Sequence, residues 1–338
     1  MKLLAIDLGY SNVKVAYYNE DGALQFDKYI SAVAKVDNPM ELDDDIMFQL
    51  GVDTYVLGSS ALKLSRSLLM NLETFDDMKA VYPVWISYLL KRYGGVDRFD
   101  KVIVGLSMAF SDKADELLQH LYDTLLIQKD NYFICLPQGL SCKLGYSMCG
   151  LDIRETSTGH SGSSELRNYI ILDGGFLTTD FCTVLGSKAS AGAAIGIPST
   201  GVICIAYDIM DYLFKEYQMK VSIKEAQNYL DSDGVFVRRG RKYDISEKVK
   251  EFTKNYLGKV LQLLEEKYGE YIDAVEGILI LGGLAYFFKK YINDQEVIKE
   301  IEKHFPITFI HLPSVDAEYY NCFSYLKAAE KILGGTEE

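Results

Sequence analysis

Three short segments of the 338-residue sequence combine an apolar run with glycines, and two of them also carry an aspartate. They are residues 4–9, residues 169–175 and residues 278–283. Glycines after a buried strand let the backbone approach a ligand closely and turn its N–H groups toward an anion. In open α/β sheets, ligands bind at the carboxyl ends of the strands. The pattern therefore predicts a phosphate-binding site built from several strand ends.

Carboxylates beside a phosphate site require a cation, because carboxylates and phosphates repel each other. Mg²⁺ keeps most of its waters and is held by one or two carboxylates together with phosphate oxygens. Asp7 and Asp173 occupy corresponding positions in two of the segments, so we expect them to hold hydrated Mg²⁺. Ser11 and Thr178 add hydroxyl donors nearby. Asp180 is expected either to order a water or to be an ordinary strand-end carboxylate.

The composition is that of a folded protein with an acidic surface. Apolar residues make up 49% of the chain and charged residues 25%, and the formal net charge is -13. This charge argues against direct binding of nucleic acid. The sequence opens without a secretory signal, and no apolar run approaches the ~20 residues that cross a bilayer, so no membrane contact is expected. Six cysteines without a C-x-x-C pair predict buried reduced thiols and a cytoplasmic protein.

The order of the predicted elements indicates α/β domains. The strand–turn–strand pattern of residues 2–18 recurs at residues 169–185, which indicates an internal duplication. We predict further strands at residues 24–33, 101–106, 132–136 and 277–281, a hairpin at 235–243, and a last strand at 307–311. We predict helices at residues 59–70, 79–93, 111–126, 200–217, 222–230 and 245–268, one from residue 285, and one at 316–333.

Several polar segments are interpreted as structural. Residues 36–53 hold an acidic cluster and residues 150–168 a serine- and glycine-bearing run, and both are expected to be surface loops. Ser199 or Thr200 is expected to cap the helix that follows, although this segment could also lie near a ligand. The basic run at residues 238–242 predicts a solvated hairpin turn, and a contact with another protomer or an adaptor stays open.

The order of these motifs resembles that of the actin / sugar kinase / chaperone ATPase superfamily. Residues 7–14 are similar to its first phosphate loop, and residues 173–180 are similar to its second. Residues 282–285 resemble its adenosine motif. Leu284 departs from that motif, in which a third small residue is usual. The resemblance covers nearly the whole chain.

The resemblance implies an α/β, actin-like ATPase fold, with two ribonuclease-H-like domains around a nucleotide cleft. Residues 1–150 together with 318–338 would form domain I, and residues 151–317 would form domain II. Residues 136–139 match the first connection between the domains. The segment that begins at Glu318 resembles the second connection, whose helix returns to domain I.

The resemblance also implies which residues bind ATP or ADP with Mg²⁺. The implied nucleotide-binding residues are Asp7, Gly9, Tyr10, Ser11, Asn12, Lys14, Gly174, Gly175, Thr178, Gly282, Gly283 and Leu284. The metal would be held by Asp7 and Asp173 through water, and the implied catalytic residues are Gln138, Asp173 and Asp180. Lys14 resembles a lysine that reaches phosphate, although an exposed hairpin residue is the alternative. ATP rather than GTP follows from the resemblance alone.

Gln138 bears most directly on the activity. In actins the matching side chain orients the attacking water. Glutamine holds a water in line but takes no proton at neutral pH, so slow hydrolysis timed by assembly is expected. The alternative is that Gln138 caps a helix after Pro137. A sugar kinase would instead need a carboxylate base beside an acceptor hydroxyl, and the sequence offers no clear candidate.

Within the superfamily, the compact length and residues 7–14 most resemble bacterial and archaeal actin-like proteins of the ParM kind. The leading interpretation is an ATPase that polymerises head to tail into filaments. Such filaments would segregate plasmid DNA or position cargo, through a separate DNA-binding adaptor. The alternatives are a small-molecule, sugar-type kinase of the same superfamily and a weakly hydrolysing structural or division actin homologue.

Overall fold

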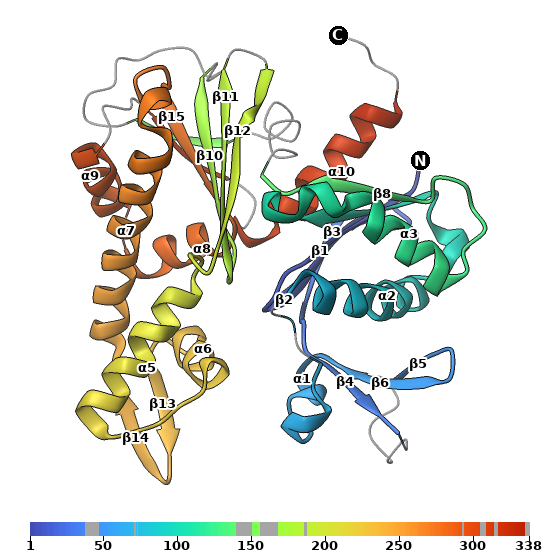
Figure 1. The fold of residues 1–338 in the computed structure, drawn as a ribbon, viewed down its shortest axis with the longest axis horizontal. Coiled ribbons are helices and arrows are strands. Elements are labelled where there is room, and N and C mark those ends of the chain that lie inside the picture. Colours follow the sequence, from blue (N-terminus) through green and yellow to red (C-terminus); the bar gives the residue numbers. More distant parts are fainter. Residues whose placement is uncertain are drawn as a thin grey trace. The chain divides into compact units, whose positions relative to one another are not determined.

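The computed structural model describes residues 1–37, 47–70, 72, 74–139, 151–155, 168–185, 188–292, 294–304, 309–313 and 317–334. The chain forms two compact units, which are drawn in Figure 1. Unit 1 comprises Met1–Met148 and Asn321–Glu338, and unit 2 comprises Cys149–Tyr320. The domain boundaries predicted after residues 150 and 317 stay a prediction beside these units.

Unit 1 is built on a five-stranded sheet in the order β3-β2-β1-β7-β8. Its strands are β1 (Leu3–Leu8), β2 (Asn12–Tyr18), β3 (Leu24–Ile30), β7 (Lys101–Leu106) and β8 (Phe133–Pro137). The first three form an antiparallel meander, and β7 and β8 continue the sheet parallel to β1. The structure confirms the predicted hairpin at residues 2–18 and the strands at 101–106 and 132–136.

Helices cover both faces of this sheet. α2 (Phe75–Arg92) and α3 (Ala114–Leu125) share a core with one face of the strands. α10 (Tyr320–Leu333) contributes to the other face, where the ring of Tyr325 fills the space that a side chain on Gly105 would need. α2 begins earlier than predicted because Thr74 and Asp77 form a capping box there.

Three predictions for unit 1 are wrong in detail. The helix expected at residues 59–70 is only α1 (Gly58–Ala61), followed by the 3₁₀ helix η1 (Arg66–Leu68). The strand expected at 24–33 ends at Ile30, and β4 (Val33–Val36) joins a separate sheet with β5 (Met47–Leu50) and β6 (Asp53–Leu57). The 3₁₀ helix η3 (Met108–Lys113) precedes α3, so Ser111 does not cap α3. Residues 38–46 of the expected acidic loop lie outside the described residues.

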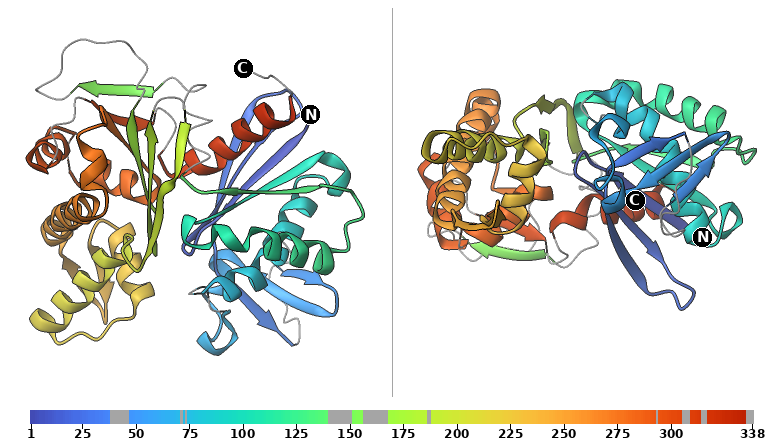
Figure 2. Two further views of the ribbon diagram at one scale, coloured as in Figure 1. Left: turned by 45° about the horizontal axis from the view of Figure 1, so that its top comes forward. Right: turned by 90° about the horizontal axis from the view of Figure 1, so that it is seen from below.

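Unit 2 is built on a six-stranded sheet in the order β12-β11-β10-β15-β16-β9. Its strands are β9 (Leu151–Glu155), β10 (Tyr169–Gly174), β11 (Thr178–Leu185), β12 (Lys188–Pro198), β15 (Gly277–Leu281) and β16 (Phe309–Pro313). The first five in the sheet repeat the order of unit 1, which agrees with the predicted duplication and can be followed in Figure 2. The sequence did not predict β9 or most of β12, and residues 156–167 of the expected loop lie outside the described residues.

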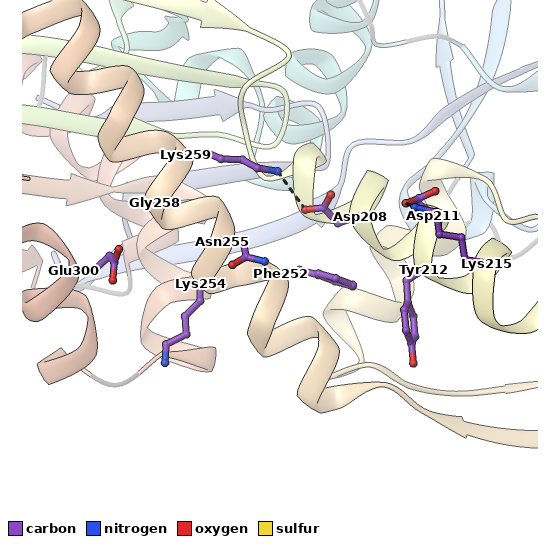
Figure 3. Close-up of a pocket in the computed structure, with 10 residues that line it drawn as sticks. All are labelled: Asp208, Asp211, Tyr212, Lys215, Phe252, Lys254, Asn255, Gly258, Lys259 and Glu300. Atoms are coloured by element: carbon purple, nitrogen blue, oxygen red, sulfur yellow. Dashed lines mark hydrogen bonds and ion pairs between the residues drawn. The ribbon is translucent and has the colours of Figure 1, made fainter. Parts of the chain in front are cut away.

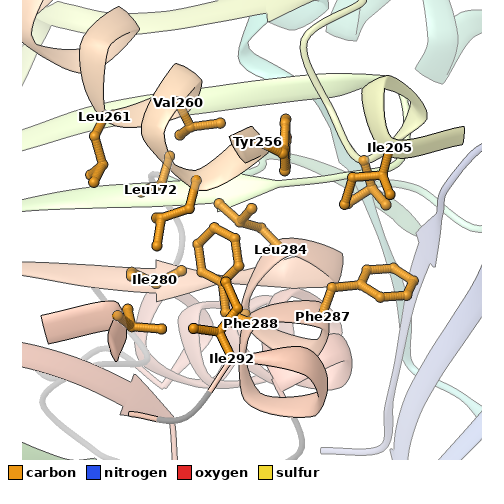
Figure 4. Packing of buried hydrophobic residues seen from close by; sticks show 14 of the residues in the cluster. Leu172, Ile205, Tyr256, Val260, Leu261, Ile280, Leu284, Phe287, Phe288 and Ile292 are labelled. Carbon is orange, nitrogen blue, oxygen red and sulfur yellow. The ribbon is translucent and has the colours of Figure 1, made fainter. Parts of the chain in front are cut away.

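Helices and one hairpin complete unit 2. They are α5 (Ile203–Tyr217), α6 (Ile223–Asp231), β13 (Val235–Arg238), β14 (Arg241–Asp244), α7 (Ser246–Ile272), α8 (Gly282–Tyr291), α9 (Asp294–His304) and the 3₁₀ helix η4 (Ala317–Tyr319). Figure 4 shows side chains of α5, α7 and α8 converging on Leu172 and Ile280 of the sheet. Each buried aliphatic or aromatic side chain stabilises such a core by ~1.5–3 kcal/mol. The sequence predicted most of these elements but not α9.

The cysteines agree with the predicted reduced state. The four that the structure describes are free, and Cys182 and Cys322 are buried. Burial raises the pKa of the Cys135 thiol to about 12, so this thiol stays protonated at neutral pH. Cys142 and Cys149 lie outside the described residues. Among the helices that the structure describes, none is long and apolar enough to span a membrane.

Candidate functional site

The link between β1 and β2 forms a tight turn, here called turn 1 (residues 7–12). The N–H of Gly9 donates to the carbonyl of Asn12 at 3.0 Å. Asp7, at its start, is 2% exposed. The Ser11 hydroxyl is buried and has no hydrogen-bond partner among the described residues. Because a buried polar atom without a partner costs ~1–3 kcal/mol, this hydroxyl fits a group that a ligand supplies.

The Asp7 carboxylate connects two side chains of unit 1. Lys14 Nζ lies 3.2 Å from Asp7 Oδ2 and is only 15% exposed, so the alternative of an exposed hairpin lysine is wrong. Gln138 Nε2 donates to Asp7 Oδ1 at 2.8 Å. With its amide nitrogen held in this way, Gln138 keeps its carbonyl Oε1 as an acceptor. The residues after Gly139 lie outside the described residues, and so does the helix that Gln138 was alternatively expected to cap.

The link between β10 and β11 forms a turn of the same kind, here called turn 2 (residues 173–178). The N–H of Gly175 donates to the carbonyl of Thr178 at 2.9 Å, which repeats the bond of turn 1. Thr178 is itself buried, at 5% exposure. The two glycine turns that the sequence predicted therefore have one backbone design.

A pair of carboxylates distinguishes turn 2. Asp173 lies directly opposite Asp180 on the neighbouring strand, and the two are 3% and 2% exposed. Side chains in such a position have Cβ atoms ~4.5–5.5 Å apart, and like charges there are destabilising. The pair therefore favours a bound cation. No group of three or more His, Cys, Asp or Glu side chains in the described part of the chain is arranged to hold a metal, so phosphate and water would have to complete its coordination.

The third predicted glycine motif joins turn 2 within unit 2. Gly282 forms a bridge with Gly174 and has a φ of +68°, which favours glycine. A Cβ on Gly282 would overlap Asp173 Oδ1, and a Cβ on Gly174 would overlap Leu284. The unusual Leu284 is fully buried and fits because Gly174 lacks a side chain.

α8 begins at Gly282, not at residue 285 as predicted. The strand therefore passes directly into the helix beside turn 2. The first N–H groups of a helix lack intrahelical partners and carry a partial positive charge, which suits an anionic ligand. The start of α8 thus adds to turn 2 a second element that favours anion binding.

The start of α5 supports turn 2, which the sequence did not reveal. The N–H groups of Val202 and Ile203 donate to the carbonyls of residues 175 and 176 at 3.0 and 2.8 Å. A Cβ on Gly201 would lie 2.5 Å from the Phe176 carbonyl oxygen, so only glycine fits this close approach. The glycine-rich composition of residues 192–201 was the only signal for this support.

The interpretation of Ser199 or Thr200 as a helix cap is wrong. α5 begins at Ile203 and has no side-chain cap, while Thr200 Oγ1 donates back to Ile197 O at 2.7 Å. The Thr200 carbonyl instead accepts two hydrogen bonds at 2.8 Å, from Thr179 Oγ1 and from Tyr256 Oη. This segment therefore fastens the strand after turn 2 to α7.

Every predicted site residue lies within the described residues. Unit 1 brings together Asp7, Gly9, Tyr10, Ser11, Asn12, Lys14 and Gln138. Unit 2 brings together Asp173, Gly174, Gly175, Thr178, Asp180, Gly282, Gly283 and Leu284. The action of these residues on a nucleotide stays a prediction.

A separate hollow of about 590 Å³ lies in unit 2 between α5, α7 and α9 (Figure 3). Its lining consists of Asp208, Asp211, Tyr212, Lys215, Phe252, Lys254, Asn255, Gly258, Lys259 and Glu300. Burial raises the pKa of Asp208, which pairs with Lys259 at 3.7 Å. None of the predicted site residues lines this hollow.

Comparisons with known proteins agree with this geometry. Residues 171–294 match the family model described as archaeal actin homologue MreB-like, C-terminal. Comparison with curated proteins gives no match. The matched stretch includes Asp173, Gly174 and the glycines of α8, which are the residues that form the unit 2 part of the candidate site.

Solved structures match over nearly the whole chain. Ta0583, an archaeal actin homologue in complex with ADP, is 15% identical with a TM-score of 0.67, over 98% of this chain and 100% of its own. A ParM from a 15-stranded Clostridium botulinum filament is 15% identical with a TM-score of 0.63, over 98% and 99%. ParM from Bacillus thuringiensis with AMPPNP is 14% identical with a TM-score of 0.61, over 99% of both chains.

The chain therefore has the actin-like fold, as the sequence predicted. The resemblance to bacterial and archaeal actin-like proteins of the ParM kind is confirmed by the same comparisons. Identities this low show the fold alone, so the activity has to be argued from this chain's own residues.

Proposed function

We propose that the chain is a filament-forming ATPase that binds Mg-ATP through turn 1, turn 2 and the start of α8. The observation that carries this proposal is the repeated turn. Gly9 and Gly175 make the same backbone hydrogen bond, and each follows a buried aspartate at the end of a central strand. Two glycine turns with nearby hydroxyls suit a ligand with several phosphates.

Residues of both turns would contact the nucleotide. In turn 1 the Ser11 hydroxyl, which is buried without a partner among the described residues, would donate to a phosphate oxygen. Lys14 would balance phosphate charge, because its ammonium already lies beside the site. The start of α8, at Gly282 and Gly283, would bind the adenosine part. ADP and AMPPNP in the similar structures support a nucleotide as the ligand.

Mg²⁺ bound with the nucleotide would neutralise phosphate charge. Asp173 and Asp180 suit a cation because they are buried opposite each other. Asp7 already receives Lys14 and Gln138. We therefore assign Asp173 the larger share of the metal site and Asp7 the smaller, both through water, with Asp180 ordering a water beside them.

Gln138 would orient the attacking water. Its amide nitrogen donates to Asp7, so its Oε1 is the atom that accepts a hydrogen bond from water. A neutral amide positions the water without taking its proton, which favours slow hydrolysis. Asp7 thereby has a second role, because it fixes the orientation of Gln138.

Assembly is proposed to be head to tail. A contact between two different surfaces of identical chains leaves a free surface at each end, so it generates filaments unless it closes into a ring. The Clostridium botulinum ParM filament supports self-association for a protein of this fold. We propose that the filament acts in the cytoplasm, without a membrane or direct nucleic-acid contact, and moves plasmid DNA or other cargo through a DNA-binding adaptor.

Sedimentation and phosphate release with Mg-ATP, Mg-ADP and EDTA test this proposal. We expect pelletable polymer with Mg-ATP and slow phosphate release. Gln138→Ala is expected to slow hydrolysis by about ten- to a hundredfold while assembly persists, because positioning of water is lost and binding is retained. Gln119→Ala, on the exposed face of α3, is the matched control and should leave turnover unchanged.

Two outcomes would contradict these assignments. Absence of polymer with every nucleotide would refute the filament function. Unchanged turnover in Gln138→Ala would refute the role of Gln138 and leave the filament function standing.

A further inference from the structure

The hairpin β13–β14 concentrates positive charge on an acidic chain. Four of the five residues from 238 to 242 are basic. We call residues 235–244 the basic hairpin. It forms a two-stranded sheet of its own, and Figure 1 shows it at the end of unit 2 away from the large sheet. Phe236 anchors it by stacking on Tyr229 and Tyr243, with ring centroids 3.7 and 5.3 Å apart.

The register of the basic hairpin sets like charges against each other. Arg238 lies directly opposite Arg241, an arrangement that destabilises a strand pair. Arg238 is partly compensated, because it lies 3.8 Å from Glu225 and donates to the Lys220 carbonyl. Arg239 and Arg241 form no ion pair with any residue that the structure describes. Packing and pairing within the chain therefore do not explain these two arginines.

The turn of the basic hairpin also carries a cost. Arg239 and Gly240 link the strands with φ values of 50° and 75°, as in a type I′ turn. Asparagine, aspartate or glycine is preferred at the first of these positions, and other residues cost ~1–2 kcal/mol in the left-handed region. The chain thus carries an arginine where a neutral residue would fold better.

Other exposed cations of unit 2 behave differently. Lys215, Lys254 and Lys290 each form an ion pair with a carboxylate of the same unit, at 2.5, 2.6 and 2.8 Å. The basic hairpin instead combines unpaired arginines with Val237, an aliphatic side chain that is 69% exposed. Arginine beside exposed apolar surface is a combination found at protein–protein contacts.

We propose that the basic hairpin binds an acidic surface of a second copy of this chain and forms part of the contact that builds the filament. The proposal rests on the proposed self-assembly. The chain's net charge of -13 makes each copy an acidic partner for a cationic tip. The same charge repels a polyanion such as DNA from the rest of the molecule, and Val237 suits a polypeptide surface.

A charge-removing variant that retains the fold tests the proposal. Arg239→Asn with Arg241→Thr and Lys242→Thr removes three charges while giving the turn and the strand residues that they prefer. Thermal stability should equal or exceed that of the wild type. The critical concentration for assembly with Mg-ATP should rise by about tenfold or more, and it should depend less on KCl than in the wild type.

A matched variant separates this surface from overall charge. Lys250→Ala with Lys267→Ala and Lys289→Ala removes three exposed lysines elsewhere in unit 2, and its critical concentration should stay within about twofold of the wild type. Binding of a fluorescent ATP analogue should be the same in all three proteins, because none of these residues lies at the candidate site.

The possible outcomes are distinct. If the hairpin variant assembles like the wild type, the hairpin proposal is overturned and the filament function stands. If it assembles normally but loses binding to a short DNA duplex in an anisotropy assay, the partner is nucleic acid and the proposal is also overturned. A wild-type chain that never assembles refutes the filament function and the hairpin contact together.

Discussion

Turn 1 and turn 2 share a backbone but differ in the charge that faces the aspartate. In the same register position, Asp7 faces Lys14 and Asp173 faces Asp180. The first pair is nearly neutral and the second is doubly acidic. An internal duplication can therefore keep the backbone that surrounds a phosphate while one substitution decides which half also favours a cation.

The two turns are also fastened by different means. Ser31, just after β3, donates its hydroxyl to the Gly9 carbonyl and its N–H to the Ser11 carbonyl. In unit 2 the corresponding place after β12 leads into α5, whose first N–H groups bond to turn 2. The first turn thus depends on one side chain and the second on a helix start, so substitutions should affect them unequally.

The largest effect is expected when turn 2 is given the charge pair of turn 1. Asp180→Lys places a cation opposite Asp173, so Mg²⁺ is no longer needed there. We expect the gain in ATP affinity that Mg²⁺ provides to fall by about a hundredfold, measured by calorimetry with and without EDTA. Asp180→Asn is the control, which removes one charge and should lose part of the gain. Retention of the full gain in Asp180→Lys would show that the acidic pair is not the metal side.

A smaller effect should come from crowding each turn. Gly282→Ala combines a positive φ with overlap onto Asp173, so we expect a loss of about 3 kcal/mol in the free energy of unfolding. Gly9→Ala places a Cβ 3.1 Å from the Asn12 carbonyl oxygen without a positive φ, and should cost about 1 kcal/mol. Urea unfolding measures both. Equal losses would mean that the two turns tolerate crowding alike.

The smallest effects should separate a ligand hydroxyl from a structural one. Ser31→Ala removes a donor to Gly9 O and should destabilise the chain by about 1 kcal/mol. Ser11→Ala removes a hydroxyl without a partner in the described structure, so stability should change by less than about 0.5 kcal/mol while ATP affinity falls about fivefold. Thermal unfolding and calorimetry measure the two quantities. Unchanged affinity in Ser11→Ala would remove Ser11 from the site.

Local pattern was sufficient for much of the fold. Apolar runs ending in glycine located β1, β10 and β15, since a buried strand has to be apolar and has to end where the chain turns. Elements without such a signal were missed. β12 reads as a glycine-rich segment, because its pairing with β11 rather than its composition makes it a strand.

The sequence by itself determined the motifs: the aspartates, the glycines and their order are local features, and they predicted the actin-like fold and both turns. Only the tertiary structure decided the partners. That Asp7 receives Gln138 from 131 positions away, that Leu284 fits against Gly174, and that Gly201 packs on turn 2 depend on contacts between distant segments. Such contacts leave no periodic trace in the sequence, because each depends on a single pair of residues that the folded sheets bring together.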